Sequence, residues 1–298
     1  MLYNYRMNSD SNSFRWSFYS SKYEYRNVFY DFHYPWAGHV YFAYDLIRNV
    51  KPKTIVELGT YKGTSFFSMC QALKDGNIKS NITAIDSWEG ETHTGKYGKC
   101  IYQTFCHIIK KFYSKVKVHT LKMYFDDAIK RFPDKSIDLL HIDGLHTYDA
   151  VKHDYEKWKD KVSDRGIILF HDIAVKEKGF GVYQFWNEIA KDNKNCLEFT
   201  HSNGLGVLTK DLDTFRILKS IKPLLIKRYT NRFIKDNILK NKRNNQLLLY
   251  IKELENKNSD VNLMLDSNLK ILNTIQETKF FKLWDKYRAI KESFFNIK

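Results

Sequence analysis

The sequence predicts an α/β fold: a doubly wound, mostly parallel seven-stranded sheet with a closing antiparallel hairpin, followed by a helical extension. Short apolar runs alternate with amphipathic stretches between residues 37 and 210, as expected of buried strands covered by helices on both faces. The pair Asn203-Gly204 separates two further apolar runs and is typical of a hairpin turn. Residues 211–298 contain one Pro and no Gly, which favours continuous helix.

The individual elements follow in order along the chain. The expected parallel strands are the apolar runs at residues 54–58, 81–86, 116–120, 136–143 and 166–170. Helices are expected at residues 64–73, 100–113, 126–131, 148–162 and 181–190. The clearest helical signal is in the fourth of these, where Val151, Tyr155, Trp158 and Val162 recur at spacings of three and four residues. Residues 196–210 are expected to form the closing hairpin.

The composition favours a soluble protein of the cytoplasm. The four cysteines match neither a zinc-site spacing nor a disulfide framework, so we interpret them as reduced thiols. The first residues lack the apolar core of a signal peptide, and no run approaches the roughly 18 apolar residues that span a bilayer. The formal net charge of +15 would suit anionic partners, but no recognition motif for nucleic acid accompanies it. Nucleic-acid binding is therefore not expected.

Three regions divide the chain. Residues 1–36 are rich in Tyr, Phe and Trp, and we expect either a lid over a ligand or a cap on a helix. Residues 37–210 form the sheet domain. Residues 211–298 carry 19 Lys and Arg against 10 Asp and Glu. Their last stretch, residues 280–298, is aromatic and basic, and is either a peripheral contact for an anionic membrane surface or a solvated helix.

The tail also contains a heptad pattern. Its seam positions alternate at spacings of four and three residues; the apolar ones are Leu247, Ile251, Leu254, Val261, Leu265, Leu272 and Ile275. Asn258 and Asn268 interrupt the seam, and a buried Asn there can fix the register and the number of chains in a coiled coil. We expect homo-oligomerisation through residues 247–275. A single helix lying on its own domain is the alternative.

Glycine and acidic residues follow the first two strands. Glu57, Gly59 and Gly63 form the pattern E-x-G-x-x-x-G at a strand-to-helix turn, where glycine allows a ligand to approach the backbone closely. The pattern is neither the G-x-G-x-x-G fingerprint nor a P-loop. Asp86 ends the second strand, and a carboxylate there can accept the hydroxyls of a nucleoside-like ligand, or simply cap the next turn.

Acidic and imidazole side chains follow the fourth and fifth strands. Asp143 and His146 come after the fourth strand, and His171 and Asp172 come at the end of the fifth. Ligands of an open parallel sheet bind beyond the carboxyl ends of its strands, so these side chains are candidates to line a site. His141 lies inside the fourth strand, where a core histidine with satisfied hydrogen bonds is more typical than a ligand.

On these residues the sequence resembles the class I S-adenosylmethionine-dependent methyltransferases, which have a Rossmann-like fold. The stretch VELGTYKG at residues 56–63 is similar to their first motif. This resemblance implies that Glu57, Gly59, Thr60, Gly63 and Asp86 hold the cofactor. Over residues 36–209, including HIDGLHTYDAVKHD at residues 141–154, the chain resembles more closely the methyltransferase domains found with bacterial polysaccharide glycosyltransferases. That subgroup implies a glycan acceptor and a glycosyltransferase partner.

Related metal-dependent O-methyltransferases, of the catechol and macrolide-sugar types, imply a metal site as well. By position, Asp143, His171 and Asp172 correspond to their metal ligands and His146 to their general base. A divalent cation there, Mg²⁺ or Mn²⁺, binds a substrate diol and lowers the pKa of its hydroxyl, and a histidine takes the proton near neutral pH. His171 departs from the pattern, because Mg²⁺ prefers oxygen ligands. Either His171 orients the ligands from outside their shell, or the metal is softer, or no metal binds.

The loop at residues 86–98 is a further candidate for ligand contact. Trp88 is expected to flank the adenine or the sugar of the cofactor, and Glu91 and His93 to face the substrate. A plain connecting loop is the alternative.

The sequence therefore predicts a metal-assisted, S-adenosylmethionine-dependent O-methyltransferase that acts on a sugar hydroxyl in glycan or polysaccharide biosynthesis. One alternative is a non-catalytic docking module, which the coiled coil recruits to a glycosyltransferase or a membrane. The other is an iron-dependent hydroxylase, because cephalosporin hydroxylases share the fold type and the metal position.

Overall fold

The computed structural model describes residues 3–4, 16–27, 35–91, 95–98, 100–277, 282–286 and 288. The chain divides into two compact units, Met1–Asp236 and Asn237–Lys298. The first holds the sheet, and the second is helical.

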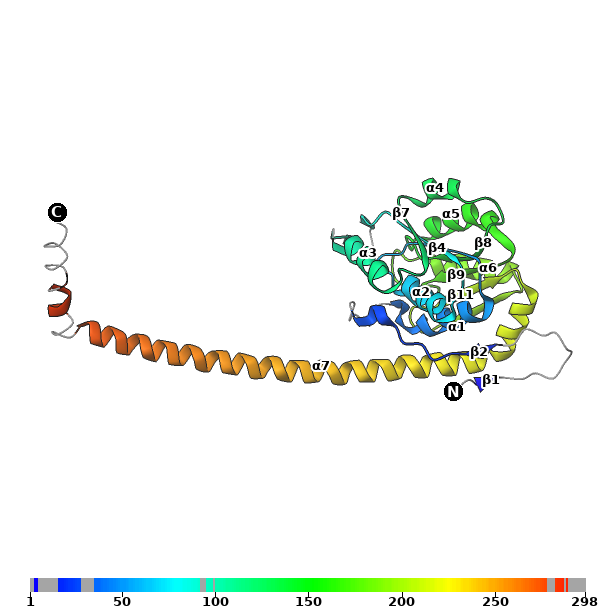
Figure 1. The fold of residues 1–298 in the computed structure, drawn as a ribbon. Coiled ribbons are helices and arrows are strands. Elements are labelled where there is room, and N and C mark those ends of the chain that lie inside the picture. Colours follow the sequence, from blue (N-terminus) through cyan, green and yellow to red (C-terminus); the bar gives the residue numbers. More distant parts are fainter. Residues whose placement is uncertain are drawn as a thin grey trace. The chain divides into compact units, whose positions relative to one another are not determined.

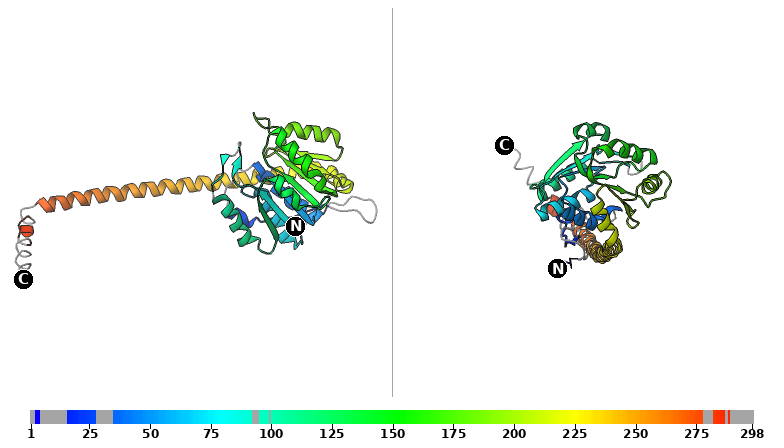
Figure 2. Two further views of the ribbon diagram at one scale, coloured as in Figure 1. Left: turned by 90° about the horizontal axis from the view of Figure 1, so that it is seen from above. Right: turned by 90° about the vertical axis from the view of Figure 1, so that its right-hand side faces the viewer.

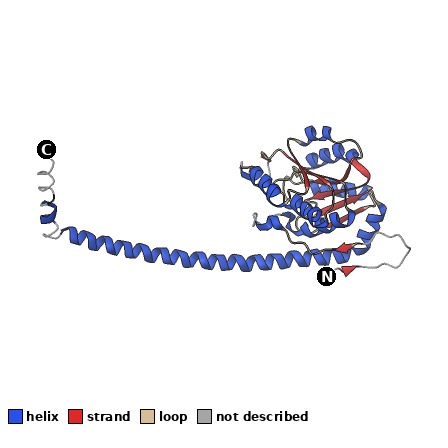
Figure 3. Ribbon diagram, in the orientation of Figure 1, coloured by secondary structure: helices blue, strands red, loops and turns tan. Residues whose placement is uncertain are grey.

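A seven-stranded sheet forms the centre of the first unit (Figures 1 and 3). Its order is β10-β11-β9-β8-β3-β4-β7. The strands are β3 (Thr54–Leu58), β4 (Asn81–Asp86), β7 (Lys117–Lys122), β8 (Ile137–Ile142), β9 (Val162–His171), β10 (Cys196–Phe199) and β11 (Leu205–Thr209). The first five are parallel, and β11 pairs antiparallel with both β9 and β10. This confirms the predicted sheet and its closing hairpin.

Helices cover both faces of the sheet, as the views at right angles in Figure 2 also show. They are α1 (Val40–Val50), α2 (Thr64–Gly76), α3 (Cys100–Phe112), α4 (Phe125–Ala128), α5 (Tyr148–Trp158), α6 (Val182–Asp192) and α7 (Leu212–Glu277). Neighbouring residues of one strand enter different cores. In β3, Ile55 packs with α1 and α2, whereas Val56 packs with α5 and α6. Alternation on a sheet that is buried on both faces explains why the strands are continuous apolar runs.

Short elements complete the first unit. They are the strands β1 (Tyr3–Asn4), β2 (Ser17–Phe18), β5 (Gly90–Glu91) and β6 (Gly95–Lys96), and the 3₁₀ helices η1 (Glu24–Asn27), η2 (Pro35–Gly38), η3 (Ile129–Arg131) and η4 (Lys159–Lys161). Two of the described aromatic residues before α1 pack on helices, whereas Trp36 packs on the imidazole of His141 in β8. Trp16 stacks on Phe42 of α1 at 6.3 Å between ring centroids, and Tyr25 contacts Phe67 of α2.

Helix α1 was not predicted from the sequence. Its polar residues Asp45, Arg48 and Asn49 do follow a helical spacing, but they occur only in the second half of a stretch that is otherwise apolar. The first turns of α7 add to the same core through Phe215, Leu218 and Leu225, and the hydroxyl of Tyr229 donates to Asp45 of α1 at 2.8 Å.

In the second unit, α7 runs on to Glu277 and a short helical stretch covers residues 282–286. All residues from 248 to 274 are exposed, including the seam residues Ile251, Val261 and Leu265. Among the described residues, none of the helices combines the length and apolar character that crossing a membrane requires.

Candidate active site

A cavity of about 410 Å³ opens beyond the carboxyl ends of β3, β4, β7, β8 and β9. Sequence-predicted residues from four of these strand ends line it: Gly59, Thr60, Gly63, Asp86, Asp143, His146, His171 and Asp172. Glu57 and Trp88 do not line it. The cavity therefore has a glycine half, formed by residues 59–63 and Asp86, and an acidic half, formed by residues 143–146 and 171–172.

Backbone geometry shapes the glycine half. Gly59 has a φ of +85°, and a Cβ atom there would lie 2.0 Å from the carbonyl oxygen of Asp143. Gly63, at the start of α2, has a φ of +82°, and its Cβ would lie within 2.9 Å of the rings of Phe67 and Phe105. Only glycine combines this conformation with such close packing. The turn thus presents its main chain to the cavity.

Asp86 holds this turn in place. One carboxylate oxygen accepts the backbone N–H of Tyr61 at 2.8 Å, and the other accepts the N–H of Trp88 at 2.7 Å. Burial raises the pKa of Asp86, and these hydrogen bonds oppose the rise. Among the described residues, the buried hydroxyl of Thr60 has no hydrogen-bond partner, so this cavity residue can still bond to a ligand.

Glu57 lies beneath the cavity. Its Oε1 accepts the hydroxyl of Ser65 in α2 and a hydrogen bond from Nδ1 of His141 in β8 at 2.8 Å. The indole N–H of Trp36 donates to Nε2 of His141 at 3.1 Å. An indole can only donate, so the His141 proton is on Nδ1. Glu57 therefore joins β3, β8 and α2, and the prediction of His141 as a satisfied core histidine is confirmed.

Trp88 supports the turn from behind. It is 5% exposed, its indole N–H donates to the carbonyl of Tyr61 at 2.9 Å, and its ring packs on Tyr102 and Phe105. Trp88 therefore reaches a ligand only through Tyr61. His93 and the side chain of Glu91 lie outside the part of the chain that the structure describes.

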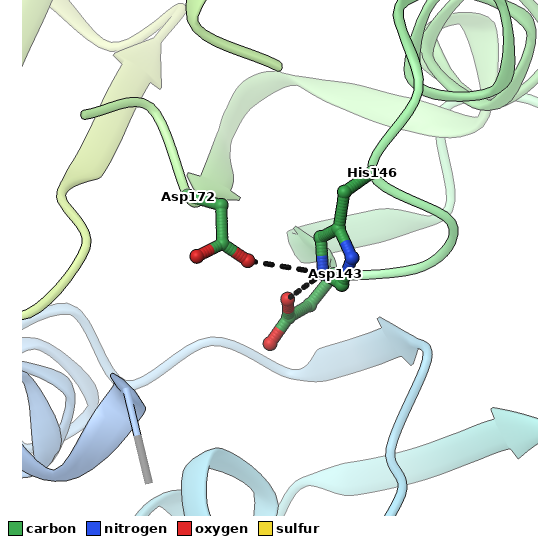
Figure 4. Close-up of side chains that lie close together, drawn as sticks. All are labelled: Asp143, His146 and Asp172. Carbon is green, nitrogen blue, oxygen red and sulfur yellow. Dashed lines mark ion pairs between the residues drawn. The ribbon is translucent and has the colours of Figure 1, made fainter. Parts of the chain in front are cut away.

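The predicted side chains of the acidic half converge, and Figure 4 shows three of them, Asp143, His146 and Asp172. Nε2 of His146 lies 3.0 Å from Oδ2 of Asp172 and 3.6 Å from Oδ1 of Asp143. Nδ1 of His171 lies 3.1 Å from Oδ2 of Asp172 and 3.3 Å from Oδ1 of Asp143. Two strands thus deliver two carboxylates and two imidazoles to one point.

In this cluster the negative charges of the carboxylates and the positive charges of the imidazoles stabilise each other. Burial disfavours all four charges, but the attraction between them outweighs it. The carboxylates raise the pKa of His146 and of His171 to about 10, and the imidazoles hold the pKa of Asp143 and Asp172 well below their usual range. The carboxylates are therefore anionic, and positive charge must accompany them.

The donor set fits a divalent cation. Donor atoms of Asp143, His146 and Asp172 all lie within 4.8 Å of one another. Nε2 of His171 lies 3.3 Å from the carbonyl oxygen of Ser202, so that nitrogen carries a proton and Nδ1 faces the carboxylates. Two carboxylates with imidazole nitrogen suit Mn²⁺ better than Mg²⁺. His146 is placed to serve either as the predicted base or as a ligand.

Sequence reasoning missed two residues of this half. Asn203 donates through Nδ2 to Oδ1 of Asp172 at 2.8 Å, and the ring of Phe180 stacks on His146 at 5.1 Å. Asn203 was interpreted as a turn residue only. Pairing the hairpin antiparallel with the fifth strand would have revealed it, because Leu205 pairs with His171 and the preceding turn must then pass Asp172.

Comparisons with known proteins agree with the predicted class. Residues 56–173 match a family of methyltransferase domains, which supports the predicted class of protein for this segment. The uncharacterized protein y4gI of Sinorhizobium fredii is 40% identical over 180 residues, which are 60% of this chain and 20% of that protein. The chain thus spans about a fifth of the length of this curated relative. The narrower assignment to the glycosyltransferase-associated subgroup stays a prediction.

Solved structures with similar folds include three methyltransferases. The SAH-bound methyltransferase PaMTH1 of Podospora anserina has a TM-score of 0.45 and 18% identity, over 58% of this chain and 78% of that chain. The O-methyltransferase TomG of Streptomyces achromogenes, in complex with SAM, has a TM-score of 0.44 and 12% identity over 58% and 80%. An O-methyltransferase of Bacillus cereus, in complex with SAH, has a TM-score of 0.42 and 12% identity over 56% and 79%.

Proposed function

We propose that this protein transfers the methyl group of S-adenosylmethionine to a sugar hydroxyl, with the help of a divalent cation. One observation carries the proposal. Within a segment that matches a methyltransferase domain, a glycine-lined backbone turn and a carboxylate–imidazole cluster face the same cavity. A reaction between a nucleoside-bearing donor and an acidified alcohol needs these two surfaces side by side.

The glycine half would hold the methyl donor. The main chain from Gly59 to Gly63 leaves room for close approach, Asp86 stands at the end of β4 where ribose hydroxyls bind in such folds, and the hydroxyl of Thr60 is available. S-adenosylmethionine, when bound, supplies the methyl group that the acceptor oxygen attacks. Glu57 and Trp88 would act indirectly, by fixing the turn.

The acidic half would hold the cation and the acceptor. Asp143 and Asp172 would be ligands, with His171 supplying nitrogen, so that His146 can act as the base. A divalent cation, when bound, offsets the two carboxylates and lowers the pKa of a nearby hydroxyl. His146 can accept a proton only in its neutral form, and positive charge at the carboxylates favours that form. His146 would then take the proton of the acceptor hydroxyl.

Aromatic side chains in the cavity support a sugar as the acceptor. Tyr61, Tyr97 and Tyr124 line the cavity, and the rings of Tyr61 and Tyr97 lie 4.5 Å apart. Aromatic faces pack well on the apolar faces of sugar rings. A glycan setting, a cytoplasmic location, a glycosyltransferase partner and contact with a membrane surface follow from the sequence alone and remain part of the proposal.

Two assays test the function. Calorimetric titration with S-adenosylmethionine should show binding. A labelled-methyl assay against nucleotide sugars and glycan fragments should show transfer that a chelator abolishes and Mn²⁺ or Mg²⁺ restores. Binding without transfer to any acceptor would favour the docking module, and iron-dependent hydroxylation without methyl transfer would favour the hydroxylase.

We also propose that residues 247–275 associate with a second copy of the chain. The described seam residues are exposed, and an apolar heptad seam on a long helix is buried when a second helix packs against it. Analytical ultracentrifugation should show an oligomer that Leu265→Glu dissociates. Lys270→Glu, on the outer side of the same heptad, should leave it intact; a monomeric wild-type chain would overturn this proposal.

A further inference from the structure

The tip of the hairpin between β10 and β11, residues 201–204, reaches the acidic half of the cavity. Asn203 donates through Nδ2 to Oδ1 of Asp172 at 2.8 Å, and its own carbonyl accepts the N–H of Ala174 at 2.9 Å. Asn203 and Asp172 have φ values of +65° and +61°. Asn and Asp adopt this conformation more readily than most residues, so both turns can hold it while their side chains bond to each other.

Because of the bond from Asn203, the two oxygens of the Asp172 carboxylate have different partners. Oδ1 is taken by the amide of Asn203, and Oδ2 faces Nε2 of His146 at 3.0 Å and Nδ1 of His171 at 3.1 Å. Rotation of the carboxylate would break the bond to Asn203. The hairpin tip therefore keeps one oxygen of Asp172 aimed at the cluster.

The same tip fixes the imidazole of His171. The carbonyl of Ser202 accepts Nε2–H of His171 at 3.3 Å and Nε2–H of His39 at 3.1 Å. A carbonyl can only accept, so Nε2 of His171 stays protonated, and Nδ1 is the nitrogen that faces the carboxylates and would give up its proton to a bound cation. His171 is 4% exposed, so water does not compete with the Ser202 carbonyl for its ring nitrogen.

The tip is itself held from the opposite side. The hydroxyl of Ser202 bonds to the carbonyl of Pro35, and the N–H of Gly38 donates to that hydroxyl at 3.1 Å. A Cβ atom at Gly38 would lie 2.6 Å from Cβ of Ser202, so the segments are in tight contact. Pro35 and Trp36 of this segment line the cavity.

From this geometry we infer that the hairpin tip positions Asp172 and His171 for cation binding, with Asn203 as the main positioning residue. The inference rests on the metal half of the proposed function. Partners outside the ligand shell orient carboxylates and select the imidazole tautomer, and their loss typically weakens metal affinity about 10- to 100-fold. Asn203 touches neither the cation nor the acceptor in this scheme and acts through Asp172.

The test compares two Asn→Gly variants at positive φ. Asn203→Gly removes the donor to Asp172 but can keep the backbone conformation, since glycine adopts positive φ freely. Asn77→Gly makes the same change at the end of α2, where φ is +48°, away from the cavity. Mn²⁺ is titrated into the full chain without donor or acceptor, and electron paramagnetic resonance reports free Mn²⁺. Circular dichroism and S-adenosylmethionine titration check that both variants are folded.

We expect Asn203→Gly to weaken Mn²⁺ binding at least about 10-fold and Asn77→Gly to leave it unchanged. Equal Mn²⁺ affinity in wild type and Asn203→Gly would overturn the positioning role and leave the proposed function standing. Methyl transfer by a wild-type chain that binds neither Mn²⁺ nor Mg²⁺ would also overturn it. Tight, Asn203-dependent Mn²⁺ binding without transfer to any acceptor would uphold the positioning role and remove the methyltransferase proposal instead.

Discussion

The two halves of the cavity are built by different means. The glycine half is made of main chain: a positive φ at Gly59 and Gly63, and a carboxylate, Asp86, that bonds to backbone amides. The acidic half is made of side chains from segments far apart in sequence, at residues 143–146, 171–172 and 202–203. The glycine half should therefore be disrupted by adding a single Cβ atom to one glycine. The acidic half should instead be disrupted by removing the charge of one side chain.

The largest expected effect breaks the acidic half alone. Asp143→Asn keeps the shape of the side chain but removes a charge that faces both imidazoles. We expect methyl transfer to fall about a thousand-fold, or about 4 kcal/mol in the activation barrier, with S-adenosylmethionine affinity unchanged. The labelled-methyl assay and calorimetry measure the two quantities. Asp149→Asn, an exposed residue in the first turn of α5, is the control and should behave as wild type.

Breaking the glycine half should cost stability as well as cofactor binding. Gly59→Ala adds a methyl group 2.0 Å from the Asp143 carbonyl, at a φ that disfavours alanine. We expect a loss of about 3 kcal/mol in the free energy of unfolding, measured in urea, and much weaker S-adenosylmethionine binding. Gly95→Ala is a matched control, because φ is +73° there but no atom lies within 4 Å of the added carbon. Similar losses in both variants would refute the role of the close approach.

A smaller effect sharpens the comparison through Asp45, a buried carboxylate outside the cavity. Among the described residues, no imidazole bonds to it. Burial raises its pKa to about 6, although the Tyr229 hydroxyl and the Tyr19 N–H bond to it. The folded chain therefore keeps this proton up to about pH 6, whereas the unfolded chain loses it near the ordinary value of 3.8. The contribution of Asp45 is greatest below that value and falls by roughly 2–3 kcal/mol as the pH rises to 6.

Asp45→Asn checks this sign. The variant should lose that part of the pH dependence and should be at least as stable as wild type at pH 7, as urea unfolding between pH 4 and pH 7 would show. A variant much less stable than wild type at pH 7 would mean that the Asp45 carboxylate is a net stabiliser despite its burial.

Much of the fold and of the site could be predicted because both follow from short-range patterns. Apolar runs mark the strands, and polar residues just after them mark the cavity edge, which is how Asp143, His146 and Asp172 were found together. The orientation of a side chain near a strand end was not predictable in the same way. Glu57 precedes the end of β3 by one residue, pairs in register with His141, and so points beneath the cavity.

Contacts between segments distant in sequence account for the remaining differences. Nothing near Asn203 in the sequence indicates that its amide meets a carboxylate 31 residues earlier. Trp88 follows Asp86 closely enough to suggest a ligand contact, yet its ring is drawn into the core by Tyr102 and Phe105. Helix α1 was missed although Asp45, Arg48 and Asn49 follow a helical spacing, because a short apolar run such as the one before them is also typical of a buried strand.

The close approach of Gly59 to the Asp143 carbonyl also joins the two halves mechanically. A ligand that orders the glycine turn would also restrain the backbone of Asp143, which carries one of the proposed cation ligands, so we expect donor binding and cation binding to be coupled. Such coupling is reciprocal, so the factor by which the donor changes the affinity for the cation equals the factor by which the cation changes the affinity for the donor. Titrating the donor with and without the cation, and the cation with and without the donor, would show whether each binds more tightly once the other is bound.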